Sequence, residues 1–164
     1  MTGIDDEKAV LQEFLRYQRA SVEAILEGLD EGQLRKAVLP SGWSPLGLVE
    51  HLGHAERHWF QQVLTGAVTP MPWPDDDTPP LTTPRPVDTV LDFYREQCRI
   101  GDEAIAATPL TAAPVGRHPE EPLASQTTDL RRIILHMIEE TARHAGHLDA
   151  ARELIDGRTE LGPR

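Results

Sequence analysis

Hydrophobic side chains recur every three or four positions along four stretches of the chain, with polar residues between them. This spacing indicates amphipathic helices, and no stretch alternates between apolar and polar residues for long enough to build a sheet. The predicted helices span roughly residues 5–29, 44–66, 86–107 and 128–156. The pattern therefore predicts an all-α protein organised as a four-helix bundle.

Capping residues and glycines mark the ends of the predicted helices. Ser44 supplies an N-cap hydroxyl for the second helix, and Pro45 follows at the first helical position. Gly66 is the expected end of that helix. Thr128 is the expected N-cap of the fourth helix, and Gly157 its expected end.

Two long connections separate the second helix from the third and the third from the fourth. The first, residues 66–86, contains seven prolines and no apolar period, so it is expected to be an irregular crossover that can wall a site. The second covers residues 108–127. Such connections predict a bundle with at least one crossover, and a length of 164 residues is typical of one domain over residues 1–164.

Charge and composition limit the classes of function that the protein can have. With 16 basic and 27 acidic residues, the formal charge of −11 disfavours a main role in binding nucleic acid or an anionic membrane. No segment reaches the roughly 18 apolar residues of a spanning helix, and no leader pattern opens the chain. A cytoplasmic protein with small-molecule or protein partners is expected. The single cysteine, Cys98, lies in a helical pattern, which favours an inert residue over a nucleophile.

The histidines are concentrated in the middle of the second and fourth predicted helices. Six of the seven fall in the segments HLGHAERH and HMIEETARHAGH. At about 100° per residue, Glu140 lies on the apolar face of the fourth helix, and His144, His147 and His136 all fall within about 40° of it. A buried carboxylate needs a partner, and a divalent cation is an efficient way to keep it ionised.

The spacing of these residues suggests a metal site. Residues four apart on a helix have Cβ atoms roughly 5–6 Å apart, so Glu140 and His144 can converge on one ion. A third ligand must come from another helix, and His51 borders the apolar arc of the second helix. His58 is intermediate, as a ligand, a supporting group or a surface residue. His54 is expected to face solvent.

Other side chains near these positions have two interpretations each. Glu56 is expected to be a partly buried carboxylate that orients a ligand or acts as a base. Trp59 is expected in the core, whereas Trp43 and Trp73 are expected in loops, where they cover a pocket or seal the bundle ends. On the pattern alone, a metal site and a polar network joining histidine, glutamate and Arg143 explain the polar face equally well.

Three ligands of mixed histidine and carboxylate type resemble catalytic zinc sites more than structural ones. Zinc, nickel, iron and manganese all accept such ligands. The sequence has no HExxH motif, Walker-type loop, dinucleotide fingerprint or nucleophile elbow, so these enzyme classes have no support.

Two segments, LVEHLGHAERHWF and HMIEETARHAGHLDAARELIDG, carry a family resemblance. Together they are similar to the DinB superfamily, and within it to a largely actinobacterial branch related to mycothiol-dependent maleylpyruvate isomerase. The resemblance covers nearly the whole chain and implies a four-helix bundle with a long crossover between helices two and three. It implies one metal ligand from the second helix and two from the fourth, which correspond to His51, Glu140 and His144.

The resemblance also implies chemistry. Glu140 corresponds to the isomerase variant of the site, and His147 stands where relatives carry a further ligand or supporting group. The implied function is a metal-dependent transferase or isomerase with a low-molecular-weight thiol such as mycothiol as co-substrate. The implied metal is zinc or nickel, and Glu56 or His147 would manage protons. A homodimer is compatible with the resemblance. The alternatives are a metal-dependent hydrolase using bound water and a non-enzymatic metal-binding stress-response protein.

Overall fold

The computed structural model describes residues 3–71, 73–74 and 77–159. Within these ranges the chain is helical and contains no strand, which confirms the all-α prediction. The helices are α1 (Gly3–Leu26), α2 (Glu31–Leu34), α3 (Pro45–Glu56), η1 (Arg57–Thr65), α4 (Val87–Ala107), α5 (Leu123–Gln126) and α6 (Leu130–Asp156). None of them is long and apolar enough to cross a membrane.

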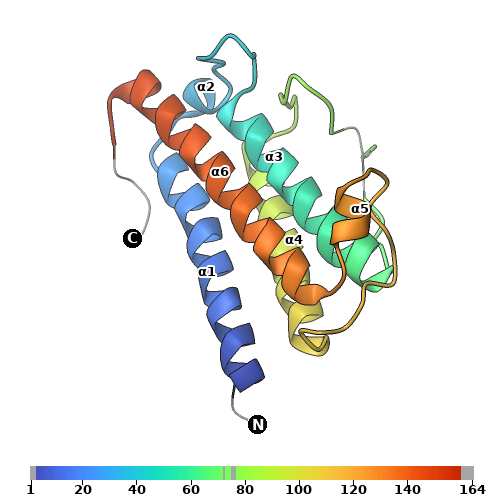
Figure 1. The fold of residues 1–164 in the computed structure, drawn as a ribbon. Helices are drawn as coiled ribbons and strands as arrows, with labels where there is room; N and C mark the ends of the chain where they lie inside the picture. The colour runs from blue at the N-terminus through green and yellow to red at the C-terminus, as the bar shows by residue number, and fades with distance from the viewer. Residues whose placement is uncertain (1–2, 72, 75–76, 160–164) are drawn as a thin grey trace.

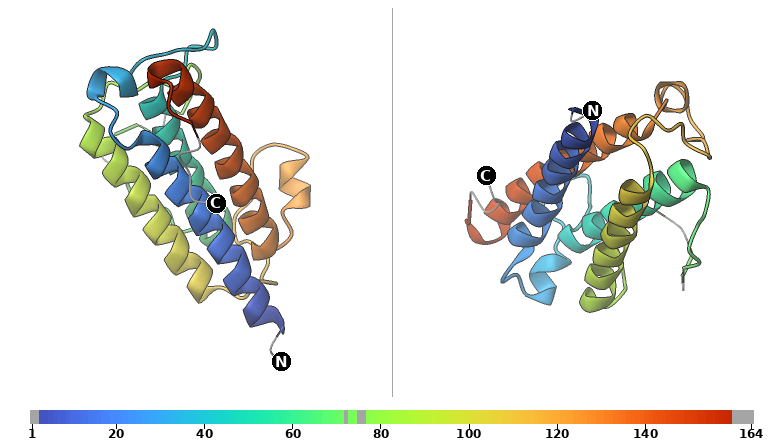
Figure 2. Two further views of the ribbon diagram at one scale, coloured as in Figure 1. Left: turned by 90° about the vertical axis from the view of Figure 1, so that its left-hand side faces the viewer. Right: turned by 90° about the horizontal axis from the view of Figure 1, so that it is seen from below.

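Four long elements form the predicted bundle. The helix α1 packs against α6, and α3 together with its continuation η1 packs against α4 (Figures 1 and 2). Helices α1 and α6 run in one direction, and α3 and α4 run in the other (Figure 1). The connection between η1 and α4 therefore returns along the length of the bundle. This is the crossover expected from the proline-rich segment.

The helix ends follow the expected capping signals, with one correction. The Ser44 hydroxyl accepts a hydrogen bond from the Gly47 amide at 3.1 Å, so α3 begins as predicted. The prediction of Thr128 as the cap of α6 was wrong by one residue. Asp129 is the N-cap, and its carboxylate accepts from the Arg132 amide at 3.0 Å. A carboxylate is a strong N-cap because its charge also complements the helix dipole.

The second predicted helix continues beyond Glu56, but in a different form. From Arg57 to Thr65 it is a π-helix, in which the backbone bonds join residues five apart and the spiral is wider. An angular projection based on 100° per residue therefore fails for His58 and the residues after it. The element ends as predicted at Gly66, which adopts a left-handed conformation with φ of 68°.

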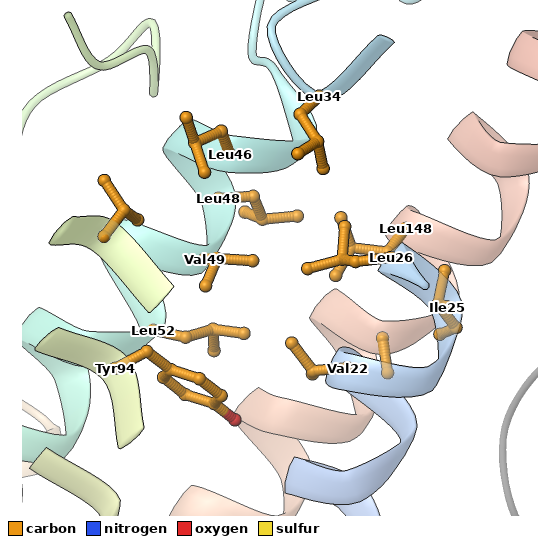
Figure 3. Close-up of a cluster of buried hydrophobic side chains, with 12 residues drawn as sticks. Val22, Ile25, Leu26, Leu34, Leu46, Leu48, Val49, Leu52, Tyr94 and Leu148 are labelled. Carbon is orange, nitrogen blue, oxygen red and sulfur yellow. The ribbon is translucent and has the colours of Figure 1, made fainter. Parts of the chain in front are cut away.

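The core consists of two apolar clusters. One lies near the α2 end of the bundle and draws residues from α1, α3, α4 and α6 (Figure 3). The other surrounds η1 and includes Trp59, which is 4% exposed, as the sequence predicted. Outside the core, Val10, Phe14 and Tyr17 of α1 remain exposed.

The connection between α4 and α6 is anchored on the end of the π-helix. The amide of Val115 donates to the Leu64 carbonyl at 3.0 Å, and that of Gly116 donates to the Val63 carbonyl at 2.8 Å. A Cβ atom at Gly116 would lie 2.2 Å from the Gln62 carbonyl oxygen. The close approach of the two backbones thus requires glycine.

Gly116→Ala should lower the free energy of unfolding by about 1–3 kcal/mol, because the added methyl group forces the two backbones apart. Gly146→Ala is the matched control. Nothing lies within 4 Å of a Cβ at Gly146 on α6, so alanine there should raise stability by about 0.5–1 kcal/mol. Urea denaturation followed by circular dichroism measures both. Equal effects of the two substitutions would contradict the anchoring role of Gly116.

Candidate metal centre

One carboxylate and two imidazoles converge between α3 and α6. The Glu140 Oε1 atom lies 3.3 Å from His51 Nε2 and 2.9 Å from His144 Nε2. The two rings meet edge to face, with centroids 5.0 Å apart. One potential ligand atom from each residue lies within 4.8 Å of the other two. In the described part of the chain, no other group of three such side chains has this geometry.

The neighbouring elements explain this convergence. Glu140 and His144 stand one turn apart on α6, so their side chains project in the same direction. His51 lies in the middle of α3, which packs against α6. The three residues singled out from the sequence are therefore brought together by the bundle itself rather than by loops.

The crossover contributes a fourth group, Asp77, which the sequence analysis missed. Its Oδ2 atom lies 2.7 Å from His51 Nδ1. A carboxylate in this position keeps the proton on Nδ1, so that Nε2, which faces Glu140, is the nitrogen that can give up its proton to bind a metal ion. Many metal-binding histidines are oriented in this way. The available signal was a run of three aspartates in a segment expected to wall a site.

The side chains of this centre shift one another's pKa values. Burial disfavours the charged form of His51, but hydrogen bonds to Asp77 and Glu140 outweigh this effect and raise its pKa to about 9. Hydrogen bonds from His144 and His51 hold the pKa of Glu140 well below its usual range. The centre is therefore built around an ionised carboxylate that attracts positive charge.

His147 lies behind His144 rather than among the three converging groups. Its Nδ1 atom is 3.3 Å from His144 Nδ1, the ring nitrogen that faces away from Glu140. The side chain is exposed, and its ring lies near Trp43, with centroids 6.1 Å apart. Burial, followed by the neighbouring His144 and Arg143, lowers the pKa of His147.

Glu56 lies elsewhere, buried more deeply than expected. Its side chain is 1% exposed, and Arg19 of α1 donates two hydrogen bonds to it, at 2.7 and 2.6 Å. Burial raises the pKa of Glu56, although Arg19 opposes the shift. Arg19 also pairs with Asp102 of α4 at 2.8 Å. The carboxylate thus joins α3 to α1 and α4, and the structure does not bring it together with His51, Glu140 and His144.

Cys98 belongs to the same buried region. Burial raises the pKa of its thiol well above the usual range, and the nearby Glu56 carboxylate adds to the shift. We expect Cys98 in the folded protein to react with an aromatic disulfide reagent at pH 8 at least about 100-fold more slowly than in urea, because thiolates are the reactive form. Absorbance of the released thiol measures the rate. Reaction at the same rate in both states would contradict the expected inertness.

A cleft of about 410 Å³ opens beside the converging groups. Its walls carry His51 and Glu140 together with Asp77 of the crossover, and side chains from α3, η1, α5 and α6 complete them. His54 also lines it. The prediction that His54 faces solvent was wrong, because His54 is 6% exposed and its ring lies 5.1 Å from that of Phe93 on α4.

A second group of histidines forms the other part of the same cleft. His58 of η1 lies against His118, which precedes α5, and both are close to Trp59. His136 of α6 contacts the Trp59 ring with centroids 4.4 Å apart. His118 was not singled out from the sequence, because it is the one histidine outside the two helical clusters.

The loop tryptophans take different positions. Trp43 precedes α3 and stands beside His147. Trp73 lies in the crossover, edge-on to Phe93, with the Arg85 guanidinium 4.8 Å from its ring centre. Both lie in loops as predicted. Neither is among the residues that line the cleft.

The fold and the centre define a class of protein. Four long helices with a crossover between the second and third enclose a histidine from one helix and a glutamate–histidine pair from another. The mycothiol-S-transferase family matches residues 10–157, a range that contains all of these side chains. The chain therefore belongs to the mycothiol-S-transferase family, part of the DinB-like superfamily. Searches of curated proteins and of solved structures found no match.

Proposed function

We propose that the protein is a divalent-metal-dependent transferase that uses a low-molecular-weight thiol of the mycothiol type as co-substrate. The family match supports thiol transfer. The observation that carries the metal dependence is the sharing of Glu140 Oε1 by two imidazole nitrogens, at 3.3 and 2.9 Å. The acceptor of the thiol would be a small molecule that enters the adjacent cleft.

The donor set fits a divalent transition metal. Two imidazoles and one carboxylate leave coordination positions for a substrate, and zinc or nickel are the metals we expect. A divalent ion held by His51, Glu140 and His144 would lower the pKa of a nearby thiol, so that the thiolate forms at neutral pH.

The protein groups around the centre have separate roles in this proposal. Asp77 orients His51 through Nδ1, and Glu140 supplies the negative charge that retains a cation. His147 is exposed, and its Nδ1 atom lies 3.3 Å from His144 Nδ1, so it can pass a proton between that ring and solvent. We therefore assign proton transfer to His147, whereas Glu56 is enclosed by Arg19 and positions α3 within the bundle.

The test is a thiol-consumption assay with mycothiol and a bimane electrophile, using protein purified without chelator. We expect consumption above the spontaneous rate, its loss after treatment with a chelator, and its recovery with Zn²⁺ or Ni²⁺. Hydrolysis of ester or amide substrates that proceeds without thiol would instead support the metal-dependent hydrolase. Tight metal binding without thiol consumption would support a non-enzymatic metal-binding protein.

A further inference from the structure

The part of the cleft away from Glu140 contains a second pair of facing imidazoles. His58 Nε2 lies 2.9 Å from His118 Nδ1. The two residues come from η1 and from the connection before α5, so tertiary structure rather than helical spacing brings them together. Both rings line the cleft, where solvent or a ligand can reach them.

A neighbouring amide fixes the orientation of His58. The Gln62 Oε1 atom lies 2.7 Å from His58 Nδ1. Because an amide oxygen only accepts hydrogen bonds, Nδ1 carries the proton and Nε2 presents a lone pair. This repeats the arrangement of His51, in which Asp77 holds Nδ1 and Nε2 faces the proposed metal position.

His118 is held in place on two sides. Its ring is stacked on Trp59, with centroids 5.0 Å apart and planes at 8°. The backbone two residues earlier is anchored to η1 through Gly116. Burial and the nearby His58 lower the pKa of His118, so its ring is neutral near pH 7. The His118 imidazole is thus held in a fixed position before any ligand binds.

The separation of the two nitrogens suits a shared cation. Metal–nitrogen bonds of about 2.0–2.1 Å place two adjacent ligand nitrogens roughly 2.9–3.4 Å apart, depending on coordination geometry. The observed 2.9 Å falls in this range. A hydrogen bond from His118 Nδ1 to His58 Nε2 gives the same separation, so a binding experiment must distinguish the two.

We propose that His58 and His118 form a second metal site in the cleft, which binds a divalent transition-metal ion such as Ni²⁺ through His58 Nε2 and His118 Nδ1. The proton of His118 then resides on Nε2, and water or a cleft ligand fills the remaining coordination positions. Imidazole is a good ligand for Ni²⁺, Cu²⁺ and Zn²⁺. With two neutral protein ligands, the site binds more weakly than the centre at Glu140 and exchanges its ion. The proposal does not depend on the transferase function.

The test is calorimetric titration of metal-free protein with Ni²⁺ at pH 7.5. We expect two sites in the natural protein, one tight and one weaker. His118→Ala should retain only the tight site, and His144→Ala only the weaker one. His136→Ala is the matched control, because His136 lines the same part of the cleft but is not one of the two proposed ligands, and it should retain both sites.

A second variant separates ligand loss from misfolding. Gln62→Leu removes the acceptor at His58 Nδ1 without touching either ligand, and it should weaken the second site by about 10–100-fold. Circular dichroism verifies the fold of each variant. The absence of the weaker site from the natural protein, or a second site that persists in His118→Ala, would overturn the proposal and leave a hydrogen-bonded histidine pair. A natural protein that shows only the weaker site would count against the proposed centre at Glu140 and not against the site at His58 and His118.

Discussion

His144→Ala should leave the protein, after extensive dialysis, with less than a tenth of the tightly bound metal that the natural protein retains. The substitution removes one of the three proposed ligands and leaves Glu140 with a hydrogen bond from His51 alone. We expect the affinity to fall by more than about 100-fold, because the loss of a mere supporting group already costs about 10–100-fold. Elemental analysis by mass spectrometry measures the ratio of metal to protein.

Two further variants calibrate this result. Asp77→Asn retains the three proposed ligands but weakens the group that orients His51, so the affinity of the centre for metal should fall by about 10–100-fold. His147→Ala should retain its metal, because His147 contacts His144 on the nitrogen away from Glu140. If His147→Ala lost metal as completely as His144→Ala, the centre would have four protein ligands and the proposed role of His147 in proton transfer would fail.

Arg19→Met should destabilise the protein by about 3–5 kcal/mol, because it leaves the Glu56 carboxylate buried without its partner. Both side chains are almost fully buried, with exposed fractions of 8% and 1%, so water cannot replace the lost hydrogen bonds. Urea denaturation at pH 7 measures the loss. The double variant Arg19→Met/Glu56→Gln should recover a large part of it, since no buried charge remains.

The cost of Arg19→Met should depend on pH in a defined direction. Burial raises the pKa of Glu56 in the folded state, whereas Arg19 lowers it. Removal of Arg19 should therefore raise the pKa of Glu56 further. A carboxyl group whose folded pKa exceeds its unfolded pKa favours folding most at low pH, and this contribution is lost as pH rises through the folded value. The deficit relative to the natural protein should therefore shrink between pH 7 and pH 5.

An exposed ion pair supplies the control for the buried one. Arg16 contacts Asp102 at 3.3 Å, but the Arg16 side chain is 60% exposed. Arg16→Met should change the free energy of unfolding by at most about 1 kcal/mol, because solvent screens such pairs. A loss as large as that of Arg19→Met would show that the burial of the ion pair with Glu56 does not determine the effect.

The long helices could be predicted from the sequence because each repeats its apolar period over several turns. The short helices could not. Helices α2 and α5 contain four residues each, which is too few for a period to emerge. The π-helix was not predicted either, since the projection assumed α-helical angles throughout.

The residues around the cleft also differ in how well the sequence predicts their positions. Glu140 and His144 were identified because they share one face of one helix, a relation that sequence spacing encodes directly. Asp77 and His118 come from connections, whose conformations depend on packing against the finished bundle. His54 was misjudged because α4, a remote segment, covers the side of α3 that carries it.

The π-helix makes the shape of the cleft sensitive to chain length. A segment with backbone bonds between residues five apart contains extra chain relative to an α-helix of the same span. Deletion of one residue between Arg57 and Thr65 would remove part of this extra chain and displace the side chains within the segment, including His58. Before the deletion point, His51 and His54 would keep their places. The position of His58 beside His118 therefore depends on the length of this segment.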